Sequence, residues 1–425
     1  MSASPNWLPP CDRAARWRRS VALRSLVPLA PLVPLLGLGA ACDVIAPPEA
    51  PPEPPPRGFY VSQPFDDIRV LTDVIVLAPE VAFAVGSGGT VLVWDGSEWT
   101  REESGVTADL EGISGVVTGE GVPELLAVGA QGTVIHRGAA GTWEPLASGV
   151  TEHLFAVWVR SPTDAFLVGE SGTVLRWSGT ALTPQLTQTR QSVVGADGTN
   201  NYFAMAQSLK GVAETDGQVF AVGASGAIYC FDPNGDPNGY PAAVLTCDNT
   251  AGNTCPAPGG ANVWQLDSSG TTRNLAGLSV SGGAYAPTTD GVLLERVSGP
   301  CPAPRDDAGR FTQDNWSDDF RVPTPAFLHD VWRDSGMTFA VGLSSDLYQF
   351  DGGTWTLVQV AAEAELRAIH GTWVPPPEDA GPEDTGGPRF FAVGGGGRIV
   401  RGPRVDPLPG ETLLTERPAD EDFAE

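Results

Sequence analysis

Residues 71–94, LTDVIVLAPEVAFAVGSGGTVLVW, contain the pattern that decides the fold. A short element, Leu71-Thr72-Asp73-Val74, precedes Phe83-Ala84-Val85-Gly86, and a turn of small residues then leads to the alternating run at 89–94. Two β-rich runs joined across a glycine turn predict a β-hairpin. Glycine in that turn permits a positive φ, which alanine would strain. The segment therefore predicts three short strands in succession.

The same hairpin recurs five more times along the chain. Near copies of Phe-Ala-Val-Gly, each followed by a turn and a second alternating run, occupy residues 126–129, 166–169, 220–223, 339–342 and 391–394. Repetition of one supersecondary unit indicates a repeat architecture.

A third element precedes each hairpin and occurs seven times. It consists of leucine, any residue, usually a small residue or aspartate, and then an aliphatic residue, and its leucines are Leu71, Leu110, Leu154, Leu209, Leu275, Leu328 and Leu366. The fifth copy has a worn hairpin at 283–286 and 291–294. A fourth, outer strand is predicted where a turn-forming segment is followed by a tryptophan, at Trp99, Trp143 and Trp355.

Seven units of about four short strands predict an all-β, seven-bladed β-propeller over residues 60–417. Each sheet has apolar residues on both faces, and radial stacking covers each face with a neighbouring sheet. Six blades follow if the worn fifth unit collapses, and eight follow if residues 202–206 belong to an extra blade. The first unit seen in the sequence begins with its inner strand and the last ends near 412–415, so this phasing predicts a ring that closes without strand exchange.

These units resemble the secreted propeller repeats of gram-negative bacteria, including the photosystem II assembly factor type, and more distantly the Asp-box repeats of sialidases. Asp351-Gly352-Gly353-Thr354-Trp355 matches the Asp-box pattern in part, and Gly141-Thr142-Trp143 matches it less. The resemblance covers about residues 66–417 and implies a propeller fold and, as its commonest use, a binding scaffold. Such boxes are structural turns, so they imply no hydrolase.

The N-terminus has the pattern of an export signal. Five arginines precede an apolar stretch at 26–41, which is short for a membrane span and is interrupted by three prolines. It ends Leu38-Gly39-Ala40-Ala41-Cys42, which resembles a bacterial lipobox, although Gly39 departs from the usual aliphatic residue. We therefore expect a signal peptide at 1–41 and a lipid on Cys42; cleavage without lipidation and twin-arginine export are the alternatives.

The residues after Cys42 support an anchored domain. Residues 43–57, DVIAPPEAPPEPPPR, contain seven prolines and predict a stiff polyproline tether within a linker at 42–59. An acidic tail is expected at 418–425. These features predict a lipid-anchored protein of a gram-negative cell envelope, periplasmic or at the outer surface, and leave open which membrane holds it.

Composition and charge exclude some classes of function. The 425 residues are 41% hydrophobic and only 18% charged, which argues against a disordered chain. The 52 glycines and 39 prolines argue against an all-helical fold. With 51 acidic against 25 basic residues the net charge is −26, which opposes nucleic-acid binding. Lys210 is the single lysine of the chain, beside 24 arginines, which we interpret as genomic base composition.

Four cysteines remain once Cys11 leaves with the signal and Cys42 is lipidated. Cys230, Cys247, Cys255 and Cys301 surround the fourth and fifth units, and an even number in an oxidising compartment predicts two disulfides. Three pairings exist; we favour Cys247–Cys255 with Cys230–Cys301. A zinc site is the alternative, although no Cys-x-x-Cys occurs.

Other segments show little chemistry. The oxygen-rich residues 232–239 are interpreted as a turn-rich loop instead of a calcium site, because no glutamate follows at the twelfth place. Residues 375–388 form an acidic proline-rich insertion. The histidines, which are His136, His153, His329 and His370, are expected at strand ends. They have no metal-binding spacing, so we expect neither a metal nor a cofactor.

The central mouth of the ring is the expected functional region. Glu111, Lys210, His329 and Arg367 occupy position two, the residue after the leucine of an inner element, although strand alternation leaves open whether that position faces a neighbouring blade. The sequence shows no catalytic constellation, so we expect a monomeric, non-enzymatic scaffold that binds a protein or a glycan. The alternative is a sialidase-like, glycan-cleaving hydrolase, which would need an acid pair and an arginine cluster in the mouth.

Overall fold

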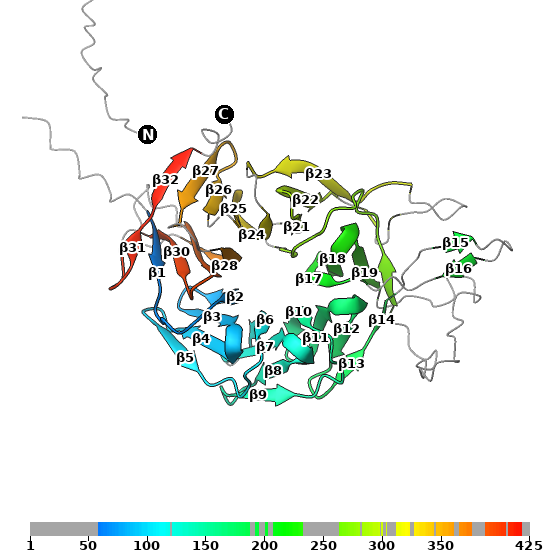
Figure 1. Cartoon of the computed structure of the whole chain (residues 1–425), viewed down its shortest axis with the longest axis horizontal. Helices are drawn as coiled ribbons and strands as arrows, with labels where there is room; N and C mark the ends of the chain where they lie inside the picture. The colour runs from blue at the N-terminus through cyan, green and yellow to red at the C-terminus, as the bar shows by residue number, and fades with distance from the viewer. Residues whose placement is uncertain are drawn as a thin grey trace, which may run out of the picture. The chain divides into compact units, whose positions relative to one another are not determined.

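The structure is a computed structural model that describes residues 58–119, 121–187, 192–194, 200–202, 207–232, 263–280, 283–297, 299–300, 303, 312–323, 327–343, 346–360, 365–375, 387–404 and 407–418. Within the compact unit Pro55–Glu425, seven sheets radiate around a central axis (Figure 1). The all-β, seven-bladed propeller predicted from the repeats is confirmed.

The first three blades are the most regular, because each has four antiparallel strands in chain order. Blade 1 contains β2 (Leu71–Ala78), β3 (Val81–Gly86), β4 (Thr90–Trp94) and β5 (Trp99–Glu102). Blade 2 contains β6 (Leu110–Val117), β7 (Pro123–Gly129), β8 (Val134–Arg137) and β9 (Trp143–Leu146). Blade 3 contains β10 (Leu154–Ser161), β11 (Asp164–Gly169), β12 (Val174–Trp177) and β13 (Leu182–Pro184).

Blades 4 to 6 carry the irregular parts of the ring. Blade 4 contains β17 (Leu209–Thr215), β18 (Gln218–Gly223), β19 (Ile228–Asp232) and β20 (Val263–Leu266), with β14 (Leu186–Thr187) added in parallel to β20. Blade 5 contains β21 (Tyr285–Pro287), β22 (Val292–Arg296) and β23 (Trp316–Arg321). Blade 6 contains β24 (Leu328–Asp334), β25 (Met337–Gly342), β26 (Asp346–Phe350) and β27 (Trp355–Gln359).

The fifth unit forms a blade of the ring although its inner element is not a continuous strand. Residues 275–279 are joined to blade 5 by isolated bridges, Leu275 to Thr288 and Ser279 to Tyr285. The predicted alternative of eight blades does not hold for the described residues, because β15 (Ser192–Val194) and β16 (Asn200–Tyr202) form a separate two-stranded sheet.

The ring closes by strand exchange, which corrects the closure expected from the sequence. Blade 7 contains β28 (Leu366–Val374), β29 (Gly387–Gly394) and β30 (Ile399–Arg404), and its fourth strand is the N-terminal β1 (Gly58–Ser62). At the other end of the chain, β31 (Thr412–Leu413) pairs with β1 and β32 (Thr415–Pro418) pairs with β27 of blade 6. The sequence-based phasing missed β1 because it precedes the first repeat and has no motif of its own.

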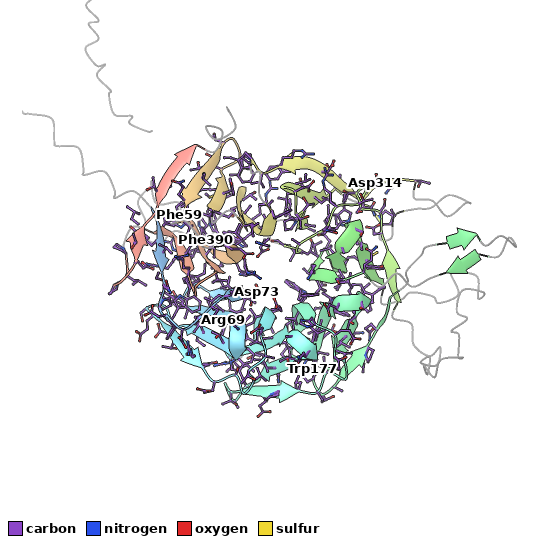
Figure 2. The ribbon with its side chains drawn as sticks, in the orientation of Figure 1. Phe59, Arg69, Asp73, Trp177, Asp314 and Phe390 are labelled. Atoms are coloured by element: carbon purple, nitrogen blue, oxygen red, sulfur yellow. The ribbon has the colours of Figure 1, made fainter. Side chains whose placement is uncertain are left out.

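Apolar burial explains why β1 takes that place. Phe59 is 2% exposed, and its ring centre lies 5.8 Å from that of Phe390 in β29 (Figure 2). Arg401 of β30 and Glu411, just before β31, form an ion pair of 2.6 Å with both side chains almost fully buried. The first and last strands of the described part are thus held by the last two blades.

The glycines of the hairpins have two separate roles. Gly89 in the 3-10 turn η1 (Ser87–Gly89) has φ +72°, as the sequence predicts, and turns η2 (Ala130–Gly132), η3 (Glu170–Gly172) and η4 (Ala224–Gly226) repeat this. Gly86, at the end of β3, is extended, and a Cβ there would lie 2.2 Å from the carbonyl oxygen of Val70. The last glycine of the Ala-Val-Gly motif is therefore required by close backbone approach.

The tryptophan turns are structural, as expected. Asp95 Oδ1 accepts hydrogen bonds from the backbone N–H groups of Ser97 and Glu98, which positions Trp99 at the start of β5. Asp351 does the same with the N–H groups of Gly353 and Thr354, before β27. These bonds lower the pKa of both carboxyl groups.

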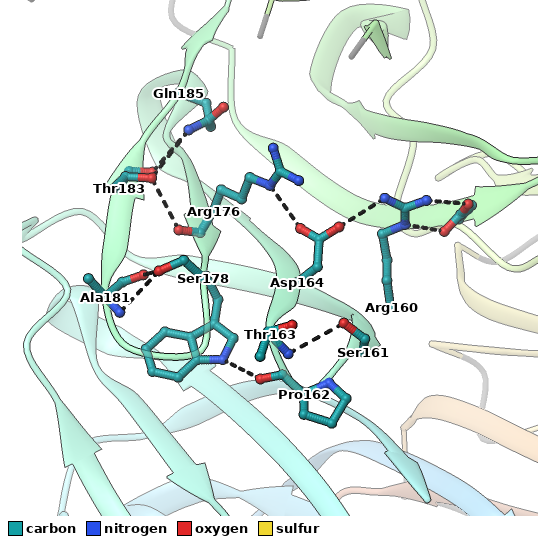
Figure 3. Close-up of polar contacts among 12 residues, drawn as sticks. Arg160, Ser161, Pro162, Thr163, Asp164, Arg176, Ser178, Ala181, Thr183 and Gln185 are labelled. Atoms are coloured by element: carbon teal, nitrogen blue, oxygen red, sulfur yellow. Dashed lines mark hydrogen bonds and ion pairs between the residues drawn. The ribbon is translucent and has the colours of Figure 1, made fainter. Parts of the chain in front are cut away.

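Arginines on the third strands join neighbouring blades. Arg176 in β12 lies over the rings of Phe166 and Phe231. Arg176 also pairs with Asp164, which pairs in turn with Arg160 (Figure 3). Arg160 makes a further two-pronged ion pair with Glu214 of blade 4. This network lies at the end of the strands opposite to the 3-10 turns. It joins blades 3 and 4.

Several predictions fall outside the described residues. They include the signal peptide, Cys42, the tether up to residue 57, Cys247, Cys255 and Cys301, most of the loop at 232–239 and most of the insertion at 375–388. Cys230 is buried in β19. The disulfide pairing and the anchor stay predictions. In the described part, no helix is long and apolar enough to cross a membrane.

Candidate functional site

A cavity of about 510 Å³ lies at the centre of the ring and is lined by the inner elements of all seven blades. The start of each inner element lies at the same end as the 3-10 turns, since Leu71 pairs with Gly86 and Leu110 with Gly129. We call this end of the cavity the mouth. Figure 2 shows Asp73 beside the central opening.

The side chains at position two line the mouth in every blade. In blade order they are Thr72, Glu111, Phe155, Lys210, Ala276, His329 and Arg367. All four residues predicted as contacts are therefore brought together, from blades 2, 4, 6 and 7. Thr72, Phe155 and Ala276 were missed, although the same position in the repeat marks them.

A β-bulge explains why position two faces the cavity. In the six regular inner strands the register shifts between the leucine and the residue two places on, as between Leu110 and Gly112. Position two is the extra residue of each bulge, and a bulge re-aims its side chain. Simple alternation, which left the direction of these side chains open, does not apply there.

Lys210 and Phe155 make direct contact across two neighbouring blades. The ammonium nitrogen of Lys210 lies 3.1 Å from the centre of the Phe155 ring, a cation–π contact. Within the part of the chain that the structure describes, no carboxylate lies within ion-pairing distance of Lys210. Burial lowers the pKa of Lys210, opposed by the negative charges of Glu111 and Glu170.

A second charged group in the mouth is centred on Glu365. Its two carboxylate oxygens contact His329 Nε2 at 2.7 Å and Arg367 at 3.1 Å. Burial is the main cause that lowers the pKa of His329, opposed by the negative charge of Glu365. Burial also raises the pKa of Glu111, opposed by the positive charges of Arg367 and Lys210. The mouth therefore presents cationic and anionic groups on different blades.

Deeper in the cavity, polar side chains join adjacent inner strands. Asp73 accepts hydrogen bonds from the N–H groups of Val74 in its own blade and Ile113 in the next, each at 2.8 Å. Asp330 does the same with Val331, at 2.8 Å, and Ile369, at 2.9 Å. These aspartates therefore hold blades 1 and 2, and blades 6 and 7, together.

Burial alters the titration of these deeper groups. It raises the pKa of Asp73 to about 8 and that of Asp330 to about 7, against the hydrogen bonds that favour the carboxylates. His370 accepts a hydrogen bond from the Val76 N–H at 3.1 Å, joining blades 7 and 1, and burial lowers its pKa to about 4. His370 lies in the middle of β28, which corrects the expectation that the histidines are at strand ends.

The arginines that a hydrolase would gather are dispersed. Arg367 lines the mouth, but Arg160 pairs with Asp164 and Glu214, and Arg333 contacts Tyr285 at 2.7 Å. Tyr285 also hydrogen-bonds Glu295 at 3.0 Å, a tyrosine–glutamate pair that the sequence analysis missed because ten residues separate its members. Burial raises the pKa of Tyr285 to about 12, and neither residue lines the cavity, so the pair is unsuited to act as a nucleophile there.

Each of the remaining two histidines lies near a single glutamate. His136 Nε2 lies 3.9 Å from Glu124, with its ring tilted against that of Trp177, and His153 contacts Glu170 through its backbone N–H. Among the described residues, no group of three or more histidine, cysteine, aspartate or glutamate side chains is arranged to hold a metal ion.

Comparison with known proteins supports the fold. No protein-family model matches the sequence, and no curated protein matches it. Among solved structures, YCF48 from Cyanidioschyzon merolae matches with a TM-score of 0.53 and 16% identity, over 80% of this chain and 98% of that one. YCF48 bound to D1 peptide matches with a TM-score of 0.50 and 14% identity, over 82% and 96%. These are propellers of the assembly-factor type that the repeats resemble.

Proposed function

We propose that this protein is a non-enzymatic scaffold that binds a segment of a partner protein in the mouth of its propeller. One observation carries the proposal: the side chains at position two of all seven blades, which differ in chemistry, line one cavity. In six of the blades a repeated bulge re-aims these side chains. Aromatic, cationic, anionic and hydroxyl groups around a cavity of several hundred Å³ suit a ligand that offers varied side chains.

The structural neighbours support a protein ligand. The YCF48 structure with D1 peptide shows that a propeller of this general form binds a polypeptide segment. In this chain the contacts we assign are Glu111, Lys210, His329 and Arg367, with Phe155 added by the structure. The ammonium of Lys210 on the ring of Phe155 is positioned to receive an acidic group, and Glu111 a basic one.

A paired assay distinguishes the scaffold from the hydrolase. The purified domain is used to capture partners from envelope membranes, and the same preparation is screened for turnover of glycans. We expect a stable protein partner that is lost in the Lys210→Met/Arg367→Met variant and retained in the matched variant Arg101→Met, which changes an arginine on the outer strand β5. Glycan turnover abolished by Glu111→Gln would overturn the scaffold and support the hydrolase.

We also propose that the propeller is held at the cell envelope by a lipid on Cys42. The apolar stretch at 26–41, the small residues before Cys42 and the proline-rich residues 43–57 support an exported, tethered domain. Wild-type protein should partition into detergent and incorporate labelled fatty acid. Cys42→Ser should do neither, with Cys11→Ser as the matched control, and membrane-bound Cys42→Ser protein would refute the anchor.

A further inference from the structure

Each blade carries one equivalent pair of residues at the edge of the mouth. The first residue of the hairpin turn donates its N–H to the carbonyl oxygen of the residue before the inner leucine, at 2.8–3.1 Å. We call these the rim pairs. They are Ser87 with Val70, Ala130 with Asp109, Glu170 with His153, Ala224 with Ser208, Thr289 with Asn274, Leu343 with Phe327, and Gly395 with Glu365.

Blade 6 departs from this pattern in its side chains. Leu343 and Phe327 are joined by the rim hydrogen bond of 2.9 Å, and their side chains are 47% and 51% exposed. The other rim pairs contain at least one small or polar residue. Because the backbone contact is the same in all blades, packing of the ring does not require two large apolar side chains at this place.

The apolar pair lies at the same end of the ring as the charged mouth, because Leu328, next to Phe327, pairs with Gly342, next to Leu343. His329, two residues after Phe327, contacts Glu365, itself paired with Arg367. Two other exposed large apolar side chains lie toward the opposite end of the ring: Val117 ends strand β6 and Val297 follows β22. The exposed apolar pair of blade 6 is thus at the end of the ring that carries the ionic groups of the mouth.

We propose that Phe327 and Leu343 form an anchoring subsite for one large apolar side chain of the protein segment bound in the mouth. This inference rests on the proposed function and specifies its ligand. The occupant is an extended polypeptide with an aliphatic or aromatic side chain on the blade 6 rim and an acidic side chain at Lys210. A polypeptide supplies, along one chain, the apolar group and the opposite charges that complement Lys210 and Glu111. A buried apolar anchor beside polar contacts is how most interfaces concentrate their binding energy.

A peptide library tests the subsite with a defined probe. A phage-displayed library of random 12-residue peptides is selected on the tethered, full-length mature protein. We expect enrichment of peptides that combine a large apolar residue with an acidic residue. Selection on Phe327→Ser/Leu343→Ser should remove the apolar preference and weaken binding of the enriched peptides at least tenfold, while Val117→Ser leaves both unchanged. Lys210→Met should remove the acidic preference.

The outcomes separate the subsite from the mouth as a whole. Peptides that bind the rim variant as tightly as wild type, but not Lys210→Met, would overturn the subsite and leave the proposed function standing. Peptides that bind all variants equally would overturn both. Self-association of wild-type protein that is lost in the rim variant, measured by sedimentation, would assign the pair to a contact between copies and refute the proposal. Equal melting temperatures of the variants establish that each is folded.

Discussion

The ammonium nitrogen of Lys210 lies 3.1 Å from the centre of the Phe155 ring, so the inner strands of blades 3 and 4 share a cation–π contact at the mouth. The chain otherwise uses arginine for every basic residue. Its single lysine therefore lies where a compact ammonium meets an aromatic face inside a cavity, which argues that chemistry, and not base composition, keeps a lysine at this position.

This contact predicts the titration of Lys210. Burial should hold its pKa below the usual 10.5, and Phe155→Leu should lower the pKa further, because the aromatic face stabilises the charged form. Protein labelled with isotopic lysine gives one ε-amino signal from the mature chain, so NMR reports this pKa directly. An unchanged or higher pKa in Phe155→Leu would show that the ring does not stabilise the ammonium; Leu77→Ile is a neutral control.

The paired acceptors of Asp73 and Asp330 predict a loss of stability in their asparagine variants. In each variant an NH2 group replaces one of the two carboxylate oxygens that accept hydrogen bonds from backbone N–H groups. One of these N–H groups then faces another donor. We expect Asp73→Asn and Asp330→Asn each to lower the free energy of unfolding by about 1–3 kcal/mol in denaturant titrations. The exposed Glu98→Gln should change it by less than about 0.5 kcal/mol. Equal stability of all three variants would show that the hydrogen bonds of Asp73 and Asp330 between adjacent blades do not stabilise the ring.

The same two carboxyl groups predict how stability depends on pH. Their pKa values rise from 3.8 to about 8 and about 7 on folding, so between about pH 4 and pH 8 these two groups bind more protons in the folded protein than in the unfolded chain. Their contribution to the free energy of unfolding should therefore decrease as pH rises through this range, whereas His370, whose pKa is lowered to about 4, contributes in the opposite direction below about pH 6.5. Asp73→Asn/Asp330→Asn should flatten the decrease. A difference in the free energy of unfolding between wild type and the double variant that does not decrease from pH 5 to pH 8 would contradict these pKa directions.

Closure of the ring through β1 predicts a large effect at Phe59. Its side chain is 2% exposed and packs on Phe390, so Phe59→Ala should lower the free energy of unfolding by about 3–5 kcal/mol. Leu413→Ala, in the same sheet but 61% exposed, should have little effect. A loss below about 1 kcal/mol in Phe59→Ala would mean that β1 does not hold the ring closed.

The repeats were sufficient to predict the blades, since each hairpin is local in sequence and its apolar residues are covered by the next copy. All seven blades have the rim hydrogen bond, including the fifth, where Thr289 donates it. Each of these bonds is made by the residue before an inner leucine, which explains why counting those leucines gave the correct number of blades. Strand exchange was not predictable in this way, because Phe59 and Phe390 are distant in sequence and β1 lies outside the repeat.

The candidate site was predicted only in part, for a physical reason. Sequence alternation assigns position two to a sheet face, whereas the bulge in the six regular inner strands turns it toward the cavity. Glu111, Lys210, His329 and Arg367 were selected because they are charged or titratable, and Phe155 was missed because an aromatic residue in a strand is usually core. The Tyr285–Glu295 contact was missed because it joins two strands across a register that the worn repeat conceals.

The most direct test of the mouth as the binding site is photo-cross-linking in the native cells. The photoreactive residue p-benzoylphenylalanine replaces Ala276, which lines the mouth, or Val117, which lies at the end of β6 toward the opposite side of the ring. The account predicts a discrete protein adduct from position 276, none from position 117, and loss of the adduct in the Lys210→Met/Arg367→Met background. An adduct that forms from position 117 and not from 276, or that persists without Lys210 and Arg367, would contradict it.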